Sequence, residues 1–115
     1  MKFALVIIET EDSRRHIREN RGVHRARIEA WMAEQAQAGK LVGGEAFETE
    51  RIAPVTVRRT GAGEANVAEG PFAGESETLG GYLLVEVADR DEAVALARSW
   101  PTAETIEVRP IWVDS

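Results

Sequence analysis

The chain has 115 residues, 14 Lys and Arg against 20 Asp and Glu, a formal net charge of −6 and no cysteine. This length fits one domain with its own core, residues 1–115. The missing cysteine excludes disulfides, thiolate catalysis and zinc–thiolate sites, and two histidines are too few for a histidine-rich metal site, so we expect no metal and no cofactor. The acidic balance argues against nucleic-acid binding. The apolar start is too short to span a membrane and has no signal-peptide pattern, which predicts a cytoplasmic protein.

The first half of the chain predicts a strand, a helix and a second strand. Residues 2–9 (KFALVIIE) are an almost unbroken apolar run, typical of a strand buried on both faces. The polar stretch 10–20 predicts a loop or a short exposed helical turn. From Val23 to Ala38 the apolar residues recur at helical spacing, and a glycine follows, as at many helix ends. Residues 40–48 then predict a strand that contains a glycine pair.

The second half predicts a hairpin and then a strand–helix–strand unit. Residues 53–59 alternate as a half-buried strand does, and the glycine-containing turn after them leads into a short return strand, 65–69. Residues 80–88 are again apolar on both faces. Residues 89–101 predict a helix with Asp89 at its N-cap, and residues 105–113 predict the last strand.

This order predicts an α+β, ferredoxin-like sandwich in which two helices lie on an antiparallel sheet. Two helices cover only one face of a sheet, although residues 2–9 and 80–88 are apolar on both faces. The economical cover for the second face is another copy of the chain, so we expect a homodimer.

Residues 14–27 carry six arginines against one glutamate. Such a cluster is suited to an anionic ligand or an acidic partner, and it is also typical of a solvated helix face with ion pairs to the acidic remainder. The sequence leaves these two alternatives open.

A bend precedes the strand at 80–88. Gly70–Pro71 forces a turn, after which we expect Phe72 to point inward as an anchor. The neighbouring acids Glu69, Glu75 and Glu77 are either a solvated loop or a pocket rim, and Glu69 is the preferred rim residue.

His24 lies on the apolar side of the predicted helix, and an imidazole is the natural general base near neutral pH in this chain. Glu45 or Glu69 is the expected carboxylate partner, while a buried structural histidine is the alternative. Gly44 and Gly81 belong to glycine pairs that either allow strand bulges or leave a cavity. Aromatic side chains that would line a ligand pocket between sheet and helices are Trp31, Phe47, Phe72 and Tyr82.

Three motifs resemble the YCII-related proteins, in particular their DGPF branch: LVGGEAF at 41–47, EGPFAGESETLGGYLL at 69–84 and VRPIW at 108–112. That branch reads Asp-Gly-Pro-Phe-Ala-Glu-Thr-Lys-Glu before Leu-Gly-Gly-Tyr. Four positions depart from it: Glu69, Gly74, Glu75 and Ser76.

The resemblance implies a ferredoxin-like fold that forms a dimeric α+β barrel. It also implies an accessory or regulatory role, because many such proteins are encoded beside sigma factors, which makes a sigma factor a candidate partner. Narrower relatives keep a His–Asp pair, and His24 stands about where their histidine does.

Two functions follow. The first is a non-catalytic binding or regulatory module that holds a small molecule. The alternative is a cofactor-independent enzyme, of lyase or isomerase type, in which His24 and Glu69 transfer a proton on a small cyclic or carbonyl compound. The fold is compatible with both.

Overall fold

The computed structural model describes residues 1–74 and 76–113. Its strands are β1 (Lys2–Thr10), β2 (Leu41–Ala46), β3 (Val55–Arg59), β4 (Ala65–Glu69), β5 (Glu77–Glu86) and β6 (Thr105–Pro110). Its helices are α1 (Glu11–Glu19), α2 (Arg21–Gln37) and α3 (Arg90–Arg98). None of these helices is long and apolar enough to cross a membrane.

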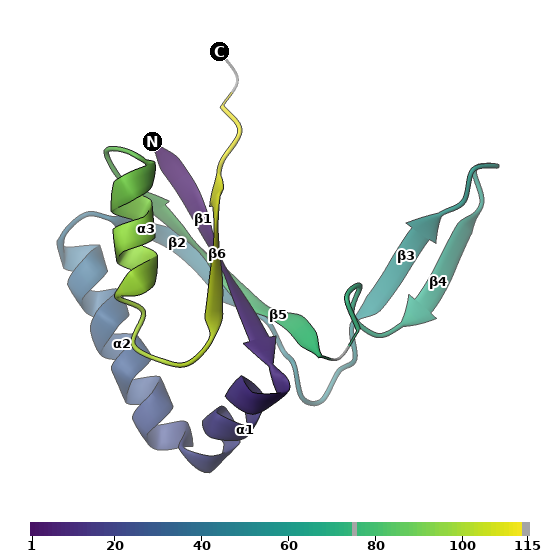
Figure 1. Ribbon diagram of the computed structural model, residues 1–115, viewed down its shortest axis with the longest axis horizontal. Coiled ribbons are helices and arrows are strands. Elements are labelled where there is room, and N and C mark those ends of the chain that lie inside the picture. Colours follow the sequence, from purple (N-terminus) through teal and green to yellow (C-terminus); the bar gives the residue numbers. More distant parts are fainter. Residues whose placement is uncertain (75, 114–115) are drawn as a thin grey trace.

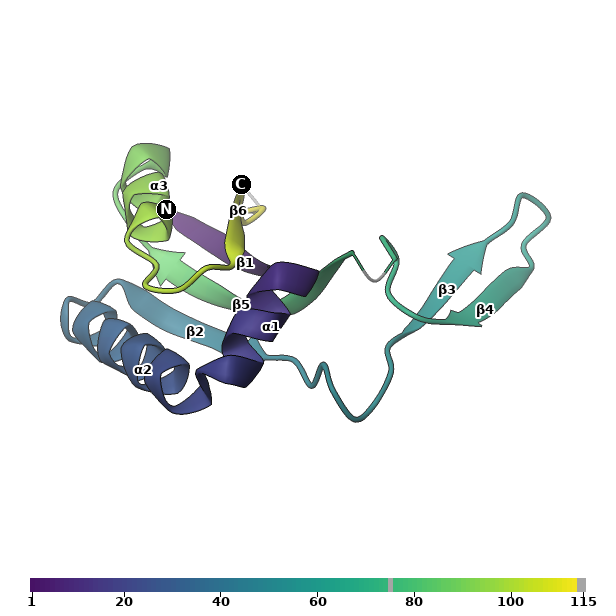
Figure 2. The same ribbon diagram turned by 60° about the horizontal axis from the view of Figure 1, so that its bottom comes forward.

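Four strands form one antiparallel sheet in the order β2-β5-β1-β6, with helical crossovers after β1 and β5 (Figure 1). This is the predicted ferredoxin-like α+β arrangement. The sheet of the single chain does not close into a barrel. Strands β3 and β4 pair only with each other and form a hairpin that projects from the body, as Figures 1 and 2 show.

The core lies between the sheet and the helices α2 and α3. Alternate residues of β1 and β5 point into it, and the helices contribute one apolar stripe each. Its buried apolar members are Phe3, Leu5, Trp31, Leu83, Val85, Val87, Ala93 and Leu96. The intervening residues Ala4, Val6 and Ile8 point to the opposite face and stay partly accessible. No described helix covers that face.

The stretch after β1 is a full helix, α1, although we expected a loop or a short turn. Its start is fixed by a reciprocal cap: the Ser13 N–H donates to Thr10 Oγ1 at 3.1 Å, and the Thr10 N–H donates to Ser13 Oγ at 2.8 Å. Serine replaces the usual glutamate of this motif, which hid the signal. The predicted cap of α3 is present, because Asp89 Oδ1 accepts from the Glu92 N–H at 2.9 Å.

The glycine pairs lie where two strands approach closely. The β1–β5 register shifts between Ile7 and Ile8, and the partner changes there from Gly81 to Leu79. Gly81 has φ +153°, and a Cβ there would lie 2.5 Å from the Glu45 carbonyl oxygen of β2. A side chain at Gly80 would collide with the carboxyl group of Glu9. Bulging and close approach therefore account for this pair.

Two predictions about the hairpin region were wrong. Strand β3 is exposed rather than half-buried, and Phe72 is 72% exposed rather than an inward anchor. The reason is that the hairpin stands away from the body, so the Phe72 ring is covered by the Arg58 guanidinium of β3, 4.5 Å from the ring centroid, rather than by the core. The bend is held by hydrogen bonds instead, from the Gly70 N–H to the Pro54 carbonyl and from Thr56 Oγ1 to the Gly70 carbonyl, both at 2.7 Å.

Candidate functional site

A buried carboxylate, Glu104, lies in the loop between α3 and β6, with its side chain only 3% exposed. Three donors surround it. His24 Nε2 is 2.5 Å from Oε1, while the Trp100 indole N–H donates to Oε2 at 3.0 Å and the Thr102 hydroxyl donates to the same oxygen. A buried charge needs such partners, and here every carboxylate oxygen has at least one.

Two indole rings hold this group in place, one from α2 and one from the segment directly after α3. Trp31 of α2 and Trp100 meet edge to face, with ring centroids 5.2 Å apart. The Trp31 indole N–H donates to Ser99 Oγ at 2.8 Å, which ties the middle of α2 to the end of α3. His24 lies two turns before Trp31 on α2, so its ring reaches Glu104 from a rigid element.

The hydrogen bonds decide the charge of Glu104. Burial by itself would raise the pKa of this carboxyl, but the hydrogen bonds from Thr102, Trp100 and His24 outweigh it and hold the pKa below its usual value. Glu104 is therefore ionised near neutral pH and can only accept, so His24 Nε2 carries the shared hydrogen. In the neutral imidazole the lone pair then lies on Nδ1, which has no hydrogen-bond partner among the described residues. The His24 side chain is 19% exposed, so solvent reaches it.

A second carboxylate, Glu9, lies near this pair at the end of β1. Burial raises its pKa, and the negative charge of Glu104 raises it further, while Arg14 and His24 act in the opposite direction with smaller effect. Gly80 provides the space above β5 that the Glu9 side chain occupies. Two neighbouring carboxyls whose pKa values shift in opposite directions are the usual basis of separate acid and base roles.

Glu9→Gln is expected to stabilise the fold at neutral pH. A carboxyl whose pKa is raised in the folded state opposes folding when ionised, and this penalty disappears as the pH falls from the folded pKa towards the unfolded value of 4.5. The gain should be less than about 1 kcal/mol, because solvent screens a partly exposed carboxylate. Urea unfolding of both proteins at several pH values measures it. A gain that does not shrink as the pH approaches 4.5 would contradict the prediction.

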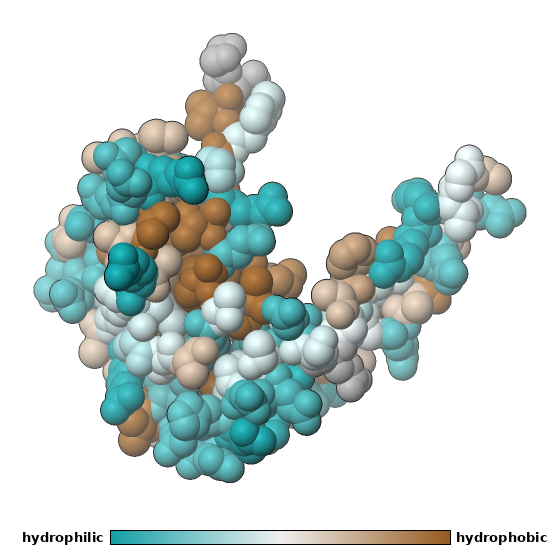
Figure 3. All heavy atoms as spheres, in the orientation of Figure 1, coloured by the Kyte–Doolittle hydropathy of each residue, from teal (hydrophilic) through white to brown (hydrophobic). Residues whose placement is uncertain are grey.

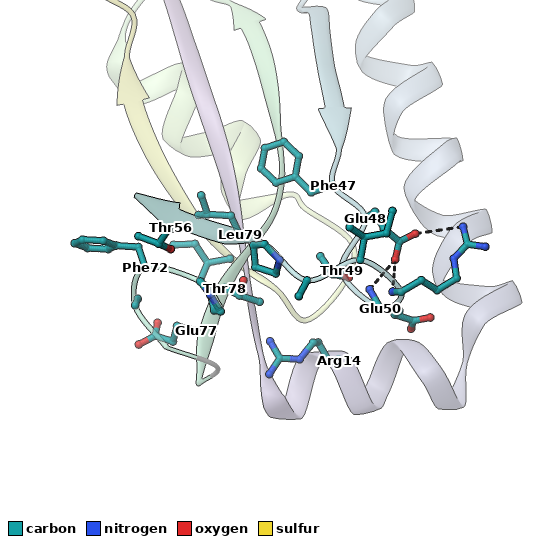
Figure 4. A pocket seen from close by; sticks show the side chains of 17 residues that line it. Arg14, Phe47, Glu48, Thr49, Glu50, Thr56, Phe72, Glu77, Thr78 and Leu79 are labelled. Atoms are coloured by element: carbon teal, nitrogen blue, oxygen red, sulfur yellow. Dashed lines mark hydrogen bonds and ion pairs between the residues drawn. The ribbon is translucent and has the colours of Figure 1, made fainter. Parts of the chain in front are cut away.

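Two cavities lie in this part of the molecule; Glu9 lines the smaller one, and neither has His24 or Glu104 in its lining. The larger, about 840 Å³, lies between the ends of β1 and β5, the β2–β3 loop and the hairpin; Phe47, Leu79 and Phe72 line it, with Glu77 at its edge (Figure 4). The smaller, which we call the α1–α2 cavity, measures about 410 Å³. Its lining residues are Glu9, Arg14, Ile17, Arg18, Arg21, Thr49 and Glu50.

The structure separates residues that we expected together. Glu45 is exposed on β2 and pairs in register with Tyr82, on the sheet face away from the core, and Glu69 is exposed on β4 of the hairpin. His24 faces the core side, so its carboxylate partner in the structure is Glu104. Trp31 belongs to the buried core cluster between the sheet and the helices.

The remaining predicted residues lie at the large cavity or on β2 and β5. Phe47 and Phe72 line that cavity, and Phe47 also contacts the Tyr82 ring at 6.1 Å between centroids. Gly44 has φ +145° and lies against the Leu83 side chain. The absence of a side chain at Gly44 therefore lets β2 lie close to β5. The second histidine, His16, is exposed on α1. Glu75 lies outside the described residues.

Sequence reasoning missed Glu104, Glu9 and Trp100. Glu104 comes shortly after a proline that ends the helix, and Glu9 is the last residue of the apolar run 2–9, so each reads as an ordinary polar residue at an element boundary. The one available signal was the spacing Trp100-x-Thr102-x-Glu104, which places two donors and an acceptor on alternate positions. In residues 1–74 and 76–113 no group of three or more His, Asp or Glu side chains is arranged to hold a metal ion.

Comparison with known proteins gives the family. The chain is 38% identical over 88 residues to "Uncharacterized protein R00369" of Rhizobium meliloti (strain 1021), a match that covers 73% of this chain and 69% of that protein. The family model of the YCII-related domain matches residues 1–113, nearly the whole chain. The chain therefore belongs to the YCII-related domain family.

Proposed function

We propose that this chain is a small-molecule enzyme that transfers a proton without a cofactor. The observation that carries the proposal is the contact between His24 and the buried, ionised Glu104, with Glu9 and its raised pKa beside them. His24 Nδ1 is the base, Glu104 fixes the ring and stabilises the imidazolium, and Glu9 returns a proton as the acid. A small cyclic or carbonyl compound with an acidic C–H bond is the matching substrate class.

Solvent deuterium exchange tests this proposal whatever product the reaction forms. The protein is incubated in D2O with a panel of small ketones, keto acids and cyclic diketones, and proton NMR follows the loss of each acidic C–H signal. We expect exchange that depends on protein concentration for at least one member. If several compounds bind but none exchanges faster than in buffer, the enzyme proposal fails.

The binding module remains the second candidate, and the large cavity favours it. Nine of the 17 residues that line that cavity are apolar, and the hairpin borders it, whereas the His24–Glu104 pair is not among its lining residues. Ligands that occupy it should perturb Phe47 and Leu79 resonances and leave the His24 ring unchanged. This pattern, together with absent exchange, would identify a module rather than an enzyme.

We also propose that the chain forms a homodimer through the open sheet face. The accessible surface of 8170 Å² exceeds by about 2000 Å² the roughly 6200 Å² expected for a compact monomer of this mass. The radius of gyration, 16.0 Å, is above the roughly 13 Å of a compact chain of this length. Figure 3 shows apolar side chains both on the side of the body that faces the hairpin and along the hairpin itself.

Light scattering measures the assembly. At micromolar concentration we expect twice the chain mass of 12.6 kDa. Val6→Lys places a charge on the open face and should halve the measured mass, because an unpaired charge buried at an interface is strongly unfavourable. Val94→Lys, on the outer side of α3, is the matched control and should leave the dimer intact. A monomeric wild-type protein would refute the dimer.

A further inference from the structure

The arginine-rich stretch 14–27 divides into two sets. Three of its arginines line the α1–α2 cavity: Arg14, Arg18 and Arg21. The other three do not. Arg15 pairs with Asp12 at 2.9 Å, Arg25 lies 3.7 Å from Glu29, and Arg27 is exposed on α2 without an ion pair to any described residue. Surface ion pairs thus account for Arg15 and Arg25, while Arg14, Arg18 and Arg21 gather at the cavity.

The lining of the α1–α2 cavity is more basic than acidic, because its three arginines face only two carboxyls. Arg21 pairs with Glu50 at 2.8 Å, whereas Arg18 forms no ion pair within the part of the chain that the structure describes. Arg14 and Arg18 stand four residues apart on α1 and therefore on one face of it. Like charges at this spacing repel each other by about 0.2–0.5 kcal/mol, and a bound anion would offset that repulsion.

The α1–α2 cavity is linked to the His24–Glu104 pair through Glu9, although neither His24 nor Glu104 lines it. Arg21 and His24 are three residues apart on α2, which places them one helical turn apart on the same side. Glu9 lines the cavity and lies close enough to His24 and Glu104 for their charges to act on it. A molecule held in this cavity by one end would therefore present its other end to the imidazole.

We propose that the α1–α2 cavity is an anion subsite, so that the substrate carries a carboxylate or phosphate group. Guanidinium groups suit both anions because their planar donors match two oxygens at once. Arg18 is the principal contact, and Arg14 and Arg21 complete the cradle. The volume of about 410 Å³ suits a small metabolite. This inference rests on the proposed proton-transfer function, because it uses the nearness of His24 to orient the substrate.

NMR titration of the full chain with inorganic phosphate, and separately with malonate, tests the subsite and shows which anion it prefers. We expect saturable shifts at Arg18, Arg21 and the His24 ring with at least one anion. Arg18→Gln should weaken that binding by about tenfold without affecting the fold, because the side chain is exposed and lacks an ion pair to any described residue. Arg27→Gln, on the outer side of α2, is the matched control and should bind as the wild type does.

The inference is overturned if neither anion gives saturable shifts, or if Arg27→Gln weakens binding as much as Arg18→Gln. Its failure is separable from that of the proposed function. His24→Gln should still bind the anion, because the proposed cradle consists of arginines. If the wild-type protein binds the anion but catalyses no deuterium exchange, the subsite is sustained and the enzyme is rejected. Exchange on neutral ketones that is insensitive to Arg18→Gln would sustain the enzyme and reject the subsite.

Discussion

Glu104→Ala is expected to lower the free energy of unfolding by about 3–5 kcal/mol, because removal of one member of a buried, hydrogen-bonded pair leaves its partners unsatisfied. His24, the Trp100 indole and the Thr102 hydroxyl all lose their acceptor. Urea unfolding near pH 7 measures the loss. Glu107→Ala is the matched control, since Glu107 is exposed and pairs with Arg109 on the surface, and it should change stability by less than about 0.5 kcal/mol.

The pH dependence of this loss gives a second check. Because the pKa of Glu104 is lowered in the folded state, its stabilisation is fully present above the unfolded value of 4.5 and is lost as the pH falls through the folded pKa. The difference between wild type and Glu104→Ala should therefore be constant near neutral pH and shrink only in acid. A loss below about 1 kcal/mol at neutral pH would show that the carboxylate is not held as described.

His24→Gln is expected to reduce the exchange rate of a responsive substrate by about 10²–10⁴-fold, the usual contribution of a positioned general base. Glutamine is chosen because its amide still donates to Glu104 but cannot take up a proton near neutral pH. The rate is measured by the same deuterium exchange, and the fold is checked by circular dichroism.

His16→Gln is the matched control for this variant. His16 is the second histidine of the chain and lies exposed on α1, so its replacement should leave the rate unchanged. If both variants exchange at the wild-type rate, His24 is not the base. If His16→Gln is the slower of the two, the base has been assigned to the wrong histidine.

The local patterns of the sequence determined most of the secondary structure and the fold class. The apolar run in residues 2–9, the helical spacing after Val23 and the Asp89 cap depend on neighbours within one or two turns, so they can be read from the chain itself. The ferredoxin-like order followed from counting these elements. The position of His24 on the inward side of its helix had the same local basis.

Tertiary structure alone decided the partner of His24. Glu104 lies 80 residues further along the chain, and the contact depends on how α3 packs across α2 through Trp31 and Trp100. No local pattern encodes that distance, so Glu45 and Glu69 looked like equally good partners. The same holds for Glu9, whose pKa is set by burial and by the charge of Glu104, neither of which is visible before the chain folds.

The hairpin shows the opposite failure, because there local signals were read as tertiary ones. Alternating valines in β3 and the aromatic Phe72 indicated burial, yet burial needs a second surface, and β3 and β4 pair only with each other away from the body. Sequence by itself thus determined the strands and the helices α2 and α3, whereas α1 was missed. Packing between distant segments determined which side chains are buried and which titratable groups meet, because burial and electrostatic coupling depend on distances through space rather than along the chain.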